Sequence, residues 1–347
     1  MRKVKLLVQI SLVASITSFK YTKESNSIIV DDPNFGPTKR DFALVYPPNI
    51  DKKSSKNDKN GKLGLIFYFH GWTGNYLDLA NQKYNQYAED YNFIMVYPSG
   101  MSDIYQYPPV EEWYSWNLGD VSNTCAINGT DHCYDSCAQL NLCNNCSWTS
   151  CYDDYLFIQV LLDYLLERYS RTNDIDLDKF VLIGESNGGM FTYLLSEKLN
   201  PKPSHFIPIY GNLPINKIIK TDGQANLLSF YDRWDDTVPI DGGQAEDGYL
   251  YQSEDTMISS WRDQNNCQIF GKMETFVTPW GKDNLRLDCM TYKSCGTEIG
   301  RNYISSCHYD GWHGWKPDYY VEEQLWWVYN FTSAVEISGS QQLLFVQ

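Results

Sequence analysis

The chain has 347 residues, of which 43% are hydrophobic and 15% aromatic, so it can bury a substantial core in one large α/β domain or two small ones. The same hydrophobic content excludes disorder on the scale of a domain. A formal net charge of −15 excludes a nucleic-acid partner, because phosphate binding needs clustered basic residues and the sequence has no such cluster.

The N-terminus has the pattern of a secretory signal peptide, which we assign to residues 1–18. A basic segment, residues 1–5, precedes the apolar stretch Leu6–Ile16, which is too short to span a bilayer, and cleavage is expected between Ser15 and Ser18. No later segment is long and apolar enough for a transmembrane helix. The sequence therefore predicts an extracellular protein, or one in the lumen of the secretory pathway, with no membrane partner.

Apolar runs that end at turn residues alternate with segments of helical spacing. The expected strands are Phe42–Tyr46, Leu63–Phe69, Phe93–Tyr97, Phe180–Ile183, Phe206–Tyr210, Leu227–Tyr231 and Tyr303–Ser306. The expected helices are Leu77–Tyr91, Asp154–Tyr169, Phe191–Leu199 and Tyr319–Phe331. This alternation predicts one α/β domain over residues 19–335, with a mostly parallel central sheet and helices on both faces, followed by a tail over residues 336–347.

The ten cysteines form two even groups, which suits an oxidising compartment. Six lie in a segment of about 120–152 that interrupts the strand and helix pattern, and four lie nearer the C-terminus. The Cys143-x-x-Cys146 spacing also fits zinc, but disulfides are favoured in a secreted chain, and the pairing among the six stays open. Glycosylation sequons at Asn128, Asn145 and Asn330 fit the same compartment. Two of them fall in the cysteine-rich segment, which we expect to be a surface insertion.

The apolar run Val181–Ile183 breaks at Gly184-Glu185-Ser186-Asn187-Gly188 and is followed by helical spacing. A G-x-S-x-G pattern between a strand and a helix is typical of a nucleophile elbow, with Ser186 at its apex. The two glycines leave room for the neighbours of so tight a turn, and the N-terminus of the helix favours developing negative charge. The alternative is a tight turn with a solvent-facing serine.

A serine hydroxyl needs a base to become a nucleophile, and the chain has five histidines. His132 lies in the cysteine-rich segment, His205 leads into a strand, and His70 precedes the serine, which is the wrong chain order. His313 is favoured over His308, because it lies in a loop between the last expected strand and the terminal helix. A disulfide at the neighbouring cysteine would hold His308 in the strand end.

Three aspartates follow the strand Leu227–Tyr231, between the serine and the histidine in chain order: Asp232, Asp235 and Asp236. Asp235 is the expected orienting acid, because a carboxylate a few residues past the strand end can reach back to the Nδ1 atom of the imidazole. The other two are then turn or helix-capping residues.

The oxyanion of an acyl-transfer intermediate needs two N–H donors. One is expected from the backbone of Asn187, directly after the serine, and the other from the loop that follows the strand Leu63–Phe69. In that loop Gly71 lets the backbone turn inward, and the N–H of Trp72 is the expected donor. His70 is expected to be structural, with its ring bracing the loop.

These motifs resemble the secreted esterases of the α/β-hydrolase superfamily that include polyhydroxybutyrate depolymerase-like proteins, feruloyl esterases and acetylxylan esterases. The resemblance runs from about Phe42 to the terminal helix. The strand-end H-G motif looks like His70–Gly74, and the G-x-S-N-G-G-M elbow matches Gly184–Met190. The acid motif H-G-T-x-D-x-x-V-P falls on Tyr231–Pro239, and the base motif G-x-H-x-W-P resembles Gly311–Pro317 with one residue inserted.

The resemblance implies an α/β-hydrolase fold and catalytic roles for Ser186, Asp235 and His313. It also implies that Trp116-Asn117 borders the active site. Two features depart from the family. Tyr231-Asp232-Arg233 replaces His-Gly-Thr before the acid, which puts a charged pair near the site and leaves the specificity open. The disulfide-rich insertion is longer than expected, and it could roof or obstruct the substrate cleft.

The sequence therefore predicts a secreted serine carboxylesterase that works through an acyl-enzyme and needs no metal and no cofactor. Its expected partner is an ester substrate, with carbohydrate-linked feruloyl or acetyl esters of plant cell-wall polysaccharide ranked ahead of the polyester poly(3-hydroxybutyrate). Trp312 and Trp315 are the expected substrate-binding residues, because indole rings suit a flat acyl group or a sugar face. A serine peptidase of the same fold and a non-catalytic secreted glycoprotein are the alternatives. We expect a monomer.

Overall fold

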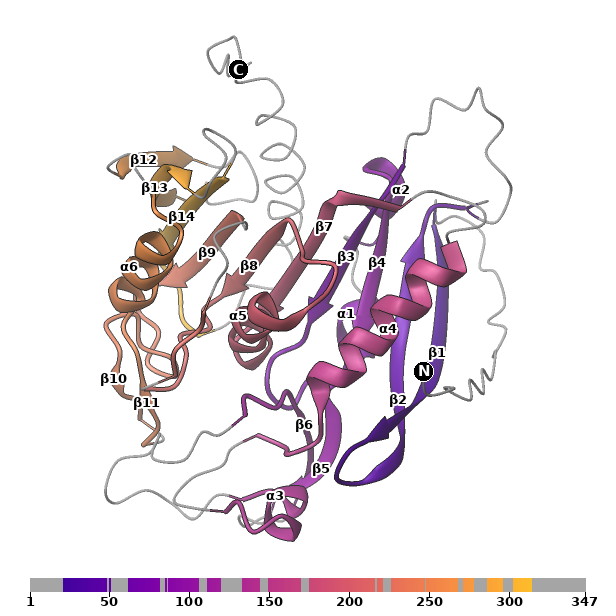
Figure 1. The fold of residues 1–347 in the computed structure, drawn as a ribbon. Coiled ribbons are helices and arrows are strands. Elements are labelled where there is room, and N and C mark those ends of the chain that lie inside the picture. The colour runs from indigo at the N-terminus through magenta and orange to yellow at the C-terminus, as the bar shows by residue number, and fades with distance from the viewer. Residues whose placement is uncertain are drawn as a thin grey trace, which may run out of the picture.

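Figure 1 shows the computed structural model, which describes residues 21–48, 50, 62–81, 85, 87–105, 111–119, 133–143, 149–169, 175–215, 217–220, 226–246, 248–267, 271–277, 286–295 and 302–313. The strands are β1 (Thr22–Asp32), β2 (Gly36–Tyr46), β3 (Leu63–Phe69), β4 (Phe93–Pro98), β5 (Met101–Tyr105), β6 (Glu111–Ser115), β7 (Ile175–Glu185), β8 (His205–Ile209), β9 (Asn226–Asp232), β10 (Gly243–Gln244), β11 (Leu250–Tyr251), β12 (Lys272–Val277), β13 (Arg286–Cys295) and β14 (Asn302–Tyr309). The helices are α1 (Tyr76–Ala80), α2 (Tyr87–Asp90), α3 (Asp135–Gln139), α4 (Asp154–Tyr169), α5 (Asn187–Lys198) and α6 (Glu254–Gln264). The expected signal peptide, terminal helix, tail and three sequons lie outside these residues.

One mixed sheet of ten strands runs through the molecule in the order β1-β2-β4-β3-β7-β8-β9-β14-β13-β12. Its centre, from β4 to β14, is parallel. Both margins are antiparallel, because β1 and β2 form a hairpin beside β4, and β12, β13 and β14 form a meander. The expected mostly parallel central sheet is therefore confirmed, and the sheet as a whole is mixed because its margins are antiparallel. Edge strands have a solvated face and lack the continuous apolar runs of buried parallel strands.

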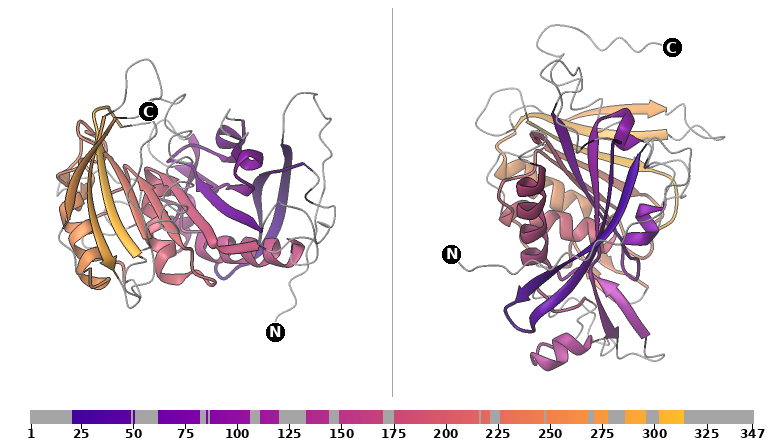
Figure 2. Two further views of the ribbon diagram at one scale, coloured as in Figure 1. Left: turned by 90° about the horizontal axis from the view of Figure 1, so that it is seen from above. Right: turned by 90° about the vertical axis from the view of Figure 1, so that its right-hand side faces the viewer.

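Helices cover both faces of the sheet, with a hydrophobic core on each side (Figures 1 and 2). On one face α4, α5 and α6 pack against the strands through residues such as Phe157, Phe191 and Trp261. On the other face α1 and α2 pack through Leu79 and Ala88. The two faces arise because successive side chains of a strand point to opposite sides.

In the neighbouring strands β3 and β7, successive side chains near the carboxyl end alternate between the two cores. Phe69 lies in the core beneath α5, whereas Tyr68 lies in the opposite core. Leu182 and Ile183 of β7 divide between the two cores in the same way. At the carboxyl edge of the sheet β7 ends in Glu185 and β3 is followed by His70, and this is the edge from which parallel α/β sheets present their functional groups.

The expected helix over residues 77–91 forms two short helices instead. Asn75 caps α1, and the Asp78 carboxylate accepts its backbone N–H at 2.8 Å, which completes a capping box. The helix ends at Ala80, whose carbonyl accepts from the buried side chain of Asn85 at 3.0 Å. The apolar spacing did not predict this break, and of its positions Ala80 is buried whereas Leu77 is 42% exposed.

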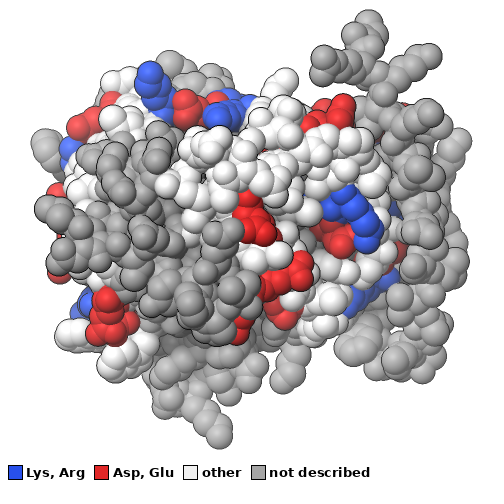
Figure 3. Space-filling view, turned by 90° about the horizontal axis from the view of Figure 1, so that it is seen from below, with Lys and Arg blue, Asp and Glu red and all other residues white. Residues whose placement is uncertain are grey.

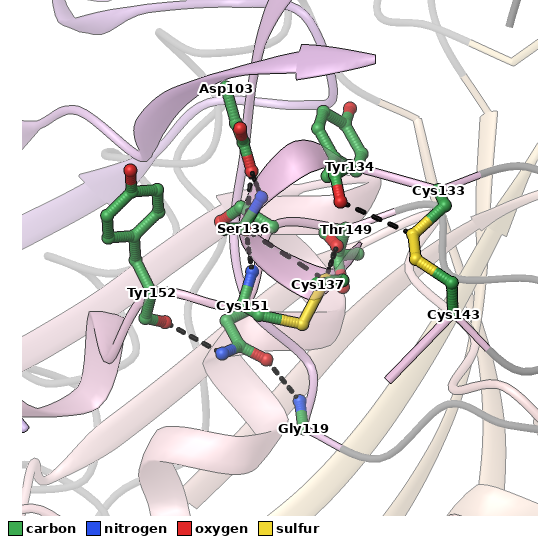
Figure 4. Close-up of a disulfide and its surroundings, with 12 residues drawn as sticks. Asp103, Gly119, Cys133, Tyr134, Ser136, Cys137, Cys143, Thr149, Cys151 and Tyr152 are labelled. Carbon is green, nitrogen blue, oxygen red and sulfur yellow. Dashed lines mark hydrogen bonds between the residues drawn. A yellow bond between two sulfur atoms is a disulfide. The ribbon is translucent and has the colours of Figure 1, made fainter. Parts of the chain in front are cut away.

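Four disulfides lie among the described residues, and each closes within one of the two cysteine groups. They are Cys133–Cys143, Cys137–Cys151, Cys267–Cys295 and Cys289–Cys307. Figure 4 shows the first two, in the insertion, where Asp103 of β5 accepts from the N–H and hydroxyl of Ser136 in α3. The hydroxyl oxygen of Ser136 accepts from the N–H of Cys151 at 2.8 Å. The described part of the insertion is thus fixed to the β5–β6 hairpin. Cys143 is in a disulfide, which agrees with the preference for disulfides over a zinc site.

The end of the molecule that carries β5, β6 and α3 faces the viewer in Figure 3. Acidic side chains lie among uncharged ones near the middle of the described surface, and the visible basic side chains lie mostly toward the rim. Among the described residues, no group of His, Cys, Asp and Glu side chains is placed to hold a metal ion. No described helix is both long and apolar enough to cross a bilayer.

Candidate active site

Ser186 lies in the turn between β7 and α5, at the carboxyl edge of the central sheet. Its φ of 50° is in the left-handed region, which few residues other than glycine adopt. The chain turns so tightly that a Cβ on Gly184 would lie 2.2 Å from the carbonyl oxygen of Gly188. A Cβ on Gly188 would lie 2.5 Å from the carbonyl oxygens of Phe69 and His70. Backbone contacts therefore require both glycines of the motif.

Replacing Gly188 by alanine is expected to lower the free energy of unfolding by about 3 kcal/mol, because the added methyl group meets backbone oxygens that cannot rotate away. Urea unfolding of the purified proteins measures the effect. Gly243→Ala is the control, since Gly243 has a φ of 89° but nothing within 4 Å of its Cβ position, and it should cost only about 1 kcal/mol. Equal stability of Gly188→Ala and the wild type would contradict the close approach.

The side chains of Ser186, His313 and Asp235 form one chain of hydrogen bonds. His313 Nε2 lies 3.0 Å from Ser186 Oγ, and His313 Nδ1 lies 2.7 Å from Asp235 Oδ2. The other carboxylate oxygen of Asp235 accepts the N–H groups of Thr237 at 2.9 Å and Val238 at 2.7 Å. Because a carboxylate can only accept, Nδ1 carries the proton of the neutral ring, and Nε2 keeps a lone pair for the serine hydroxyl. The arrangement can deprotonate Ser186.

The other two aspartates of this loop do not reach the histidine. Asp232 Oδ1 accepts the N–H of Trp234 at 3.0 Å and that of Gly311 at 2.9 Å, so it ties the loop after β9 to the loop after β14. Burial raises the pKa of Asp232. Asp236 is exposed. Of the three candidates, only Asp235 contacts the imidazole in the described structure.

Arg233 joins the same two loops. Its guanidinium pairs with Asp288 of β13 at 2.6 Å and with Asp310, next to β14, at 2.7 Å. Its backbone N–H donates to the carbonyl of Tyr309 at 3.0 Å. The charged residue that departs from the family motif therefore fixes the spacing between the acid loop and the histidine loop.

The structure gives His308 and His205 other contacts. His308 Nε2 lies 3.0 Å from a carboxylate oxygen of Glu254 on α6, and its neighbour Cys307 is held by a disulfide, as expected. His205 Nδ1 lies 2.9 Å from the hydroxyl of Ser204, and burial lowers the pKa of His205 to about 4. His132 lies outside the described residues.

The loop after β3 lies directly against the serine. A Cβ on Gly71 would lie 3.5 Å from the Cβ of Ser186. The backbone N–H of Thr73 donates to the backbone carbonyl of Tyr114 in β6 at 2.9 Å, which holds the loop in place. Asn187 is the first residue of α5, where N–H groups have no acceptor within the helix. The expected oxyanion donors are the N–H groups of Trp72 and Asn187. Trp72 directly follows Gly71 and Asn187 directly follows Ser186, so both lie next to the close approach of Gly71 to Ser186.

Two solved structures with a similar fold are titled esterases. The chain is similar to an acetyl xylan esterase from Aspergillus awamori, with a TM-score of 0.50 and 13% sequence identity over 93% of this chain and 99% of that one. It is also similar to a ferulic acid esterase, with a TM-score of 0.50 and 10% identity over 91% of this chain and all of that one (100%). The chain has an α/β-hydrolase fold. No family model and no curated protein matches the sequence.

Within this α/β-hydrolase fold, the side chain of Asn187 has contacts that the sequence did not reveal. Its amide oxygen accepts the N–H of Trp116 at 2.7 Å, and its amide nitrogen donates to the Trp116 carbonyl at 3.1 Å. The Trp116 indole donates to the carbonyl of His70 at 2.9 Å and stacks on Phe191 with ring centroids 5.0 Å apart. The Trp116-Asn117 signal located this residue near the site but did not identify its partner. Helix α5 and the loop after β3 are therefore linked through one tryptophan.

His70 braces the same loop, as the sequence led us to expect. Its Nδ1 lies 2.7 Å from the carbonyl oxygen of Gly71, and its Nε2 lies 2.9 Å from the backbone nitrogen of Gly100. The carbonyl needs a donor and the amide needs an acceptor, so the proton is on Nδ1 and the ring is neutral. Burial lowers the pKa of His70 to about 4, which keeps the ring neutral at neutral pH.

The disulfide-rich insertion supports the loop after β3 through Tyr134. Trp72 Nε1 donates to the Tyr134 hydroxyl at 2.6 Å, and the Trp72 ring packs edge-on against Trp113 of β6 at 4.6 Å. Tyr134 is fully buried and follows Cys133, which is in a disulfide. The insertion is therefore attached to the residue whose backbone is an expected oxyanion donor.

Replacing Tyr134 by phenylalanine is expected to lower kcat/KM on an ester about five-fold, because loss of a hydrogen bond worth about 1 kcal/mol loosens the loop after β3, which carries the expected oxyanion donor. The matched control is Tyr152→Phe, which removes a hydroxyl from the same insertion on a residue that contacts Phe35 instead. Steady-state kinetics of both variants measure the effect. Equal losses for the two would show that the contact to Trp72 is irrelevant.

Two exposed tryptophans lie on the loops that carry Asp235 and His313. Trp312 is 70% exposed and Trp234 is 64% exposed. Their loops are joined by Asp232, whose Oδ1 accepts N–H groups from both. Trp315, the other expected substrate-binding residue, lies outside the described residues.

Proposed function

We propose that this protein is a secreted serine carboxylesterase, and the hydrogen-bonded chain from Asp235 through His313 to Ser186 is the observation that carries the proposal. Ser186 Oγ attacks the ester carbonyl carbon while His313 Nε2 takes its proton, which gives an oxyanion and an imidazolium. The ester C–O bond breaks as Nε2 returns the proton to the leaving alkoxide. A water deprotonated by Nε2 then hydrolyses the acyl-enzyme and restores the serine.

The proposed oxyanion donors are the backbone N–H groups of Trp72 and Asn187. Two contacts support them: Trp116 bonds to both the Asn187 side chain and the His70 carbonyl, and His70 bonds to the loop backbone. Donors that are held in this way already point to the position of the oxyanion before its charge develops. Each contributes about 3 kcal/mol to the stability of the transition state.

Carbohydrate-linked acetyl or feruloyl esters are the proposed substrates. The fold is shared with proteins titled acetyl xylan esterase and ferulic acid esterase, which supports this class at the level of fold. The exposed indoles of Trp312 and Trp234 offer flat apolar faces beside the site, which suit a sugar or a hydroxycinnamoyl ring. A poly(3-hydroxybutyrate) ester is the second candidate.

An extracellular location is part of the proposal. Four disulfides suit an oxidising compartment, and residues 1–18 have the signal-peptide pattern. Secretion would be tested by the N-terminal sequence of protein recovered from the culture medium of an expressing cell, which should begin near residue 19. Retention of residues 1–18 in cell-associated protein would contradict it.

Labelling with a fluorophosphonate probe tests the activated serine without knowledge of the substrate. We expect one label per chain, on the peptide that contains Ser186, with loss of ester hydrolysis in proportion to labelling. A folded protein that neither reacts nor hydrolyses an ester would be a non-catalytic glycoprotein, and the proposal would be wrong.

The substrate class is tested by rates on acetylated xylan, methyl ferulate, a short hydroxybutyrate oligomer and a peptide amide. The first two should be cleaved with the highest kcat/KM, and the amide should not be cleaved. Faster cleavage of the oligomer would favour the polyesterase, and cleavage of the amide would favour the peptidase.

A further inference from the structure

Glu185 places a second carboxylate beside the proposed nucleophile. It ends β7, and tyrosines from both sides donate to it: Tyr68 of β3 to Oε1, and Tyr210, which follows β8, to Oε2 at 3.3 Å. Tyr68 is fully buried, and Tyr210 is nearly so. Burial raises the pKa of Glu185, and the two hydroxyls act in the opposite direction by stabilising the ionised carboxylate. No role for Glu185 could be predicted from the sequence, because it occupies a variable position of the elbow motif.

Tyr210 connects Glu185 to His313. Its ring packs against the His313 ring with centroids 4.8 Å apart and planes at 68°, while its hydroxyl donates to Glu185. Its φ of 35° lies in the left-handed region, and its N–H donates to the carbonyl of Phe230 at 2.8 Å. An unfavourable backbone conformation that is held in this way is typical of functional sites. Here it sets one aromatic ring against both the carboxylate and the imidazole.

The charge on His313 interacts with more than one carboxyl group. The groups that face or interact with its ring are Ser186, Asp235, Asp232, Tyr210 and Glu185. The charge on His313 lowers the pKa of Glu185, against the effect of burial. Because interaction free energies are reciprocal, an ionised Glu185 favours the imidazolium over the neutral imidazole to the same extent.

We propose that Glu185 is a positioning residue whose carboxylate, held by Tyr68 and Tyr210, stabilises the imidazolium that His313 becomes when it takes the serine proton. The inference rests on the proposed function, because the imidazolium forms only if His313 is the base. Both ring nitrogens already have partners in Ser186 and Asp235, so Glu185 acts through space by its charge. Acylation and deacylation both pass through the imidazolium, and both barriers fall.

The test compares Glu185→Gln with Asp236→Asn, each of which removes one negative charge from the chain. Glutamine has the shape of glutamate and still accepts from one tyrosine, and Asp236 is an exposed residue of the loop after β9. The pH profile of kcat/KM on p-nitrophenyl acetate is measured for wild type and both variants. Fluorophosphonate titration fixes the concentration of active protein in each.

For Glu185→Gln we expect the acid limb of the profile to move to lower pH by about half a unit, because the imidazolium loses its proton more easily without the carboxylate. The plateau value of kcat should fall by no more than about three-fold, the factor that corresponds to half a pH unit, with KM unchanged. The Asp236→Asn profile should overlay that of the wild type.

Tyr210→Phe is the second variant, which keeps the ring against His313 but removes one hydrogen bond that stabilises the ionised Glu185. We expect a smaller shift of the acid limb in the same direction, and this variant decides the matter if Glu185→Gln does not fold. A lower rate with an unmoved acid limb would overturn the inference and leave Glu185 with a structural role only. A wild-type protein that neither labels nor cleaves the ester would overturn the proposed function, and this inference with it.

Discussion

Replacing Ser186 by alanine is expected to lower kcat on an ester about a million-fold, because the variant lacks the oxygen that forms the acyl-enzyme. The protein should keep its stability, since the Ser186 side chain makes no capping hydrogen bond to α5 and alanine has the same backbone freedom. Steady-state rates and the thermal midpoint of the purified variant measure the two effects. Loss of activity at unchanged stability would assign the effect to chemistry.

The matched control for this prediction is Ser204→Ala. Ser204 also has its hydroxyl beside a histidine, since Ser204 Oγ lies 2.9 Å from His205 Nδ1. The Nε2 atom of His205 is buried without a hydrogen-bond partner, so no carboxylate orients that ring in the described structure. Ser204→Ala should therefore keep wild-type activity. Residual wild-type rates in Ser186→Ala, or their loss in Ser204→Ala, would place the nucleophile elsewhere.

The central strands could be predicted because they are buried on both faces. Every residue of β3 and of β4 is buried, so their sequences are continuous apolar runs. β1 could not be recognised in this way, since its side chains alternate between buried and partly exposed and many are polar. β13 alternates similarly. The place of β3 between β4 and β7 is set by contacts between distant segments, which no local pattern reports.

The candidate site shows the same division between local and distant information. Ser186 and its glycines are marked by the steric needs of one tight turn, so a short motif identifies them. Asp235 was expected from its position a few residues past the strand end, whereas the turn at Thr237 and Val238, whose N–H groups hold its carboxylate, is seen only in the structure. The contact of Asn187 with Trp116 joins residues 71 positions apart and could not be read from the sequence.

Asp235→Asn is the second change with a large expected effect, a fall in kcat of about ten-thousand-fold. Asparagine can keep its carbonyl oxygen where Oδ1 accepts the N–H groups of Thr237 and Val238, and this directs the amide nitrogen at His313 Nδ1. That nitrogen can only donate, so Nδ1 must accept and the ring proton moves to Nε2. The imidazole then presents a proton to Ser186 and cannot take one. Kinetics and fluorophosphonate labelling should both report the loss.

The controls for this change are the two neighbouring aspartates, Asp232→Asn and Asp236→Asn. Asp232 bonds to backbone N–H groups through Oδ1, which asparagine retains, so Asp232→Asn should lose less than about ten-fold in kcat. Asp236 is exposed, so Asp236→Asn should keep the wild-type kcat. A larger loss in Asp232→Asn than in Asp235→Asn would move the orienting role to Asp232. The comparison is sharp because all three variants remove the same charge from one loop, and only Asp235 has a carboxylate oxygen on the imidazole.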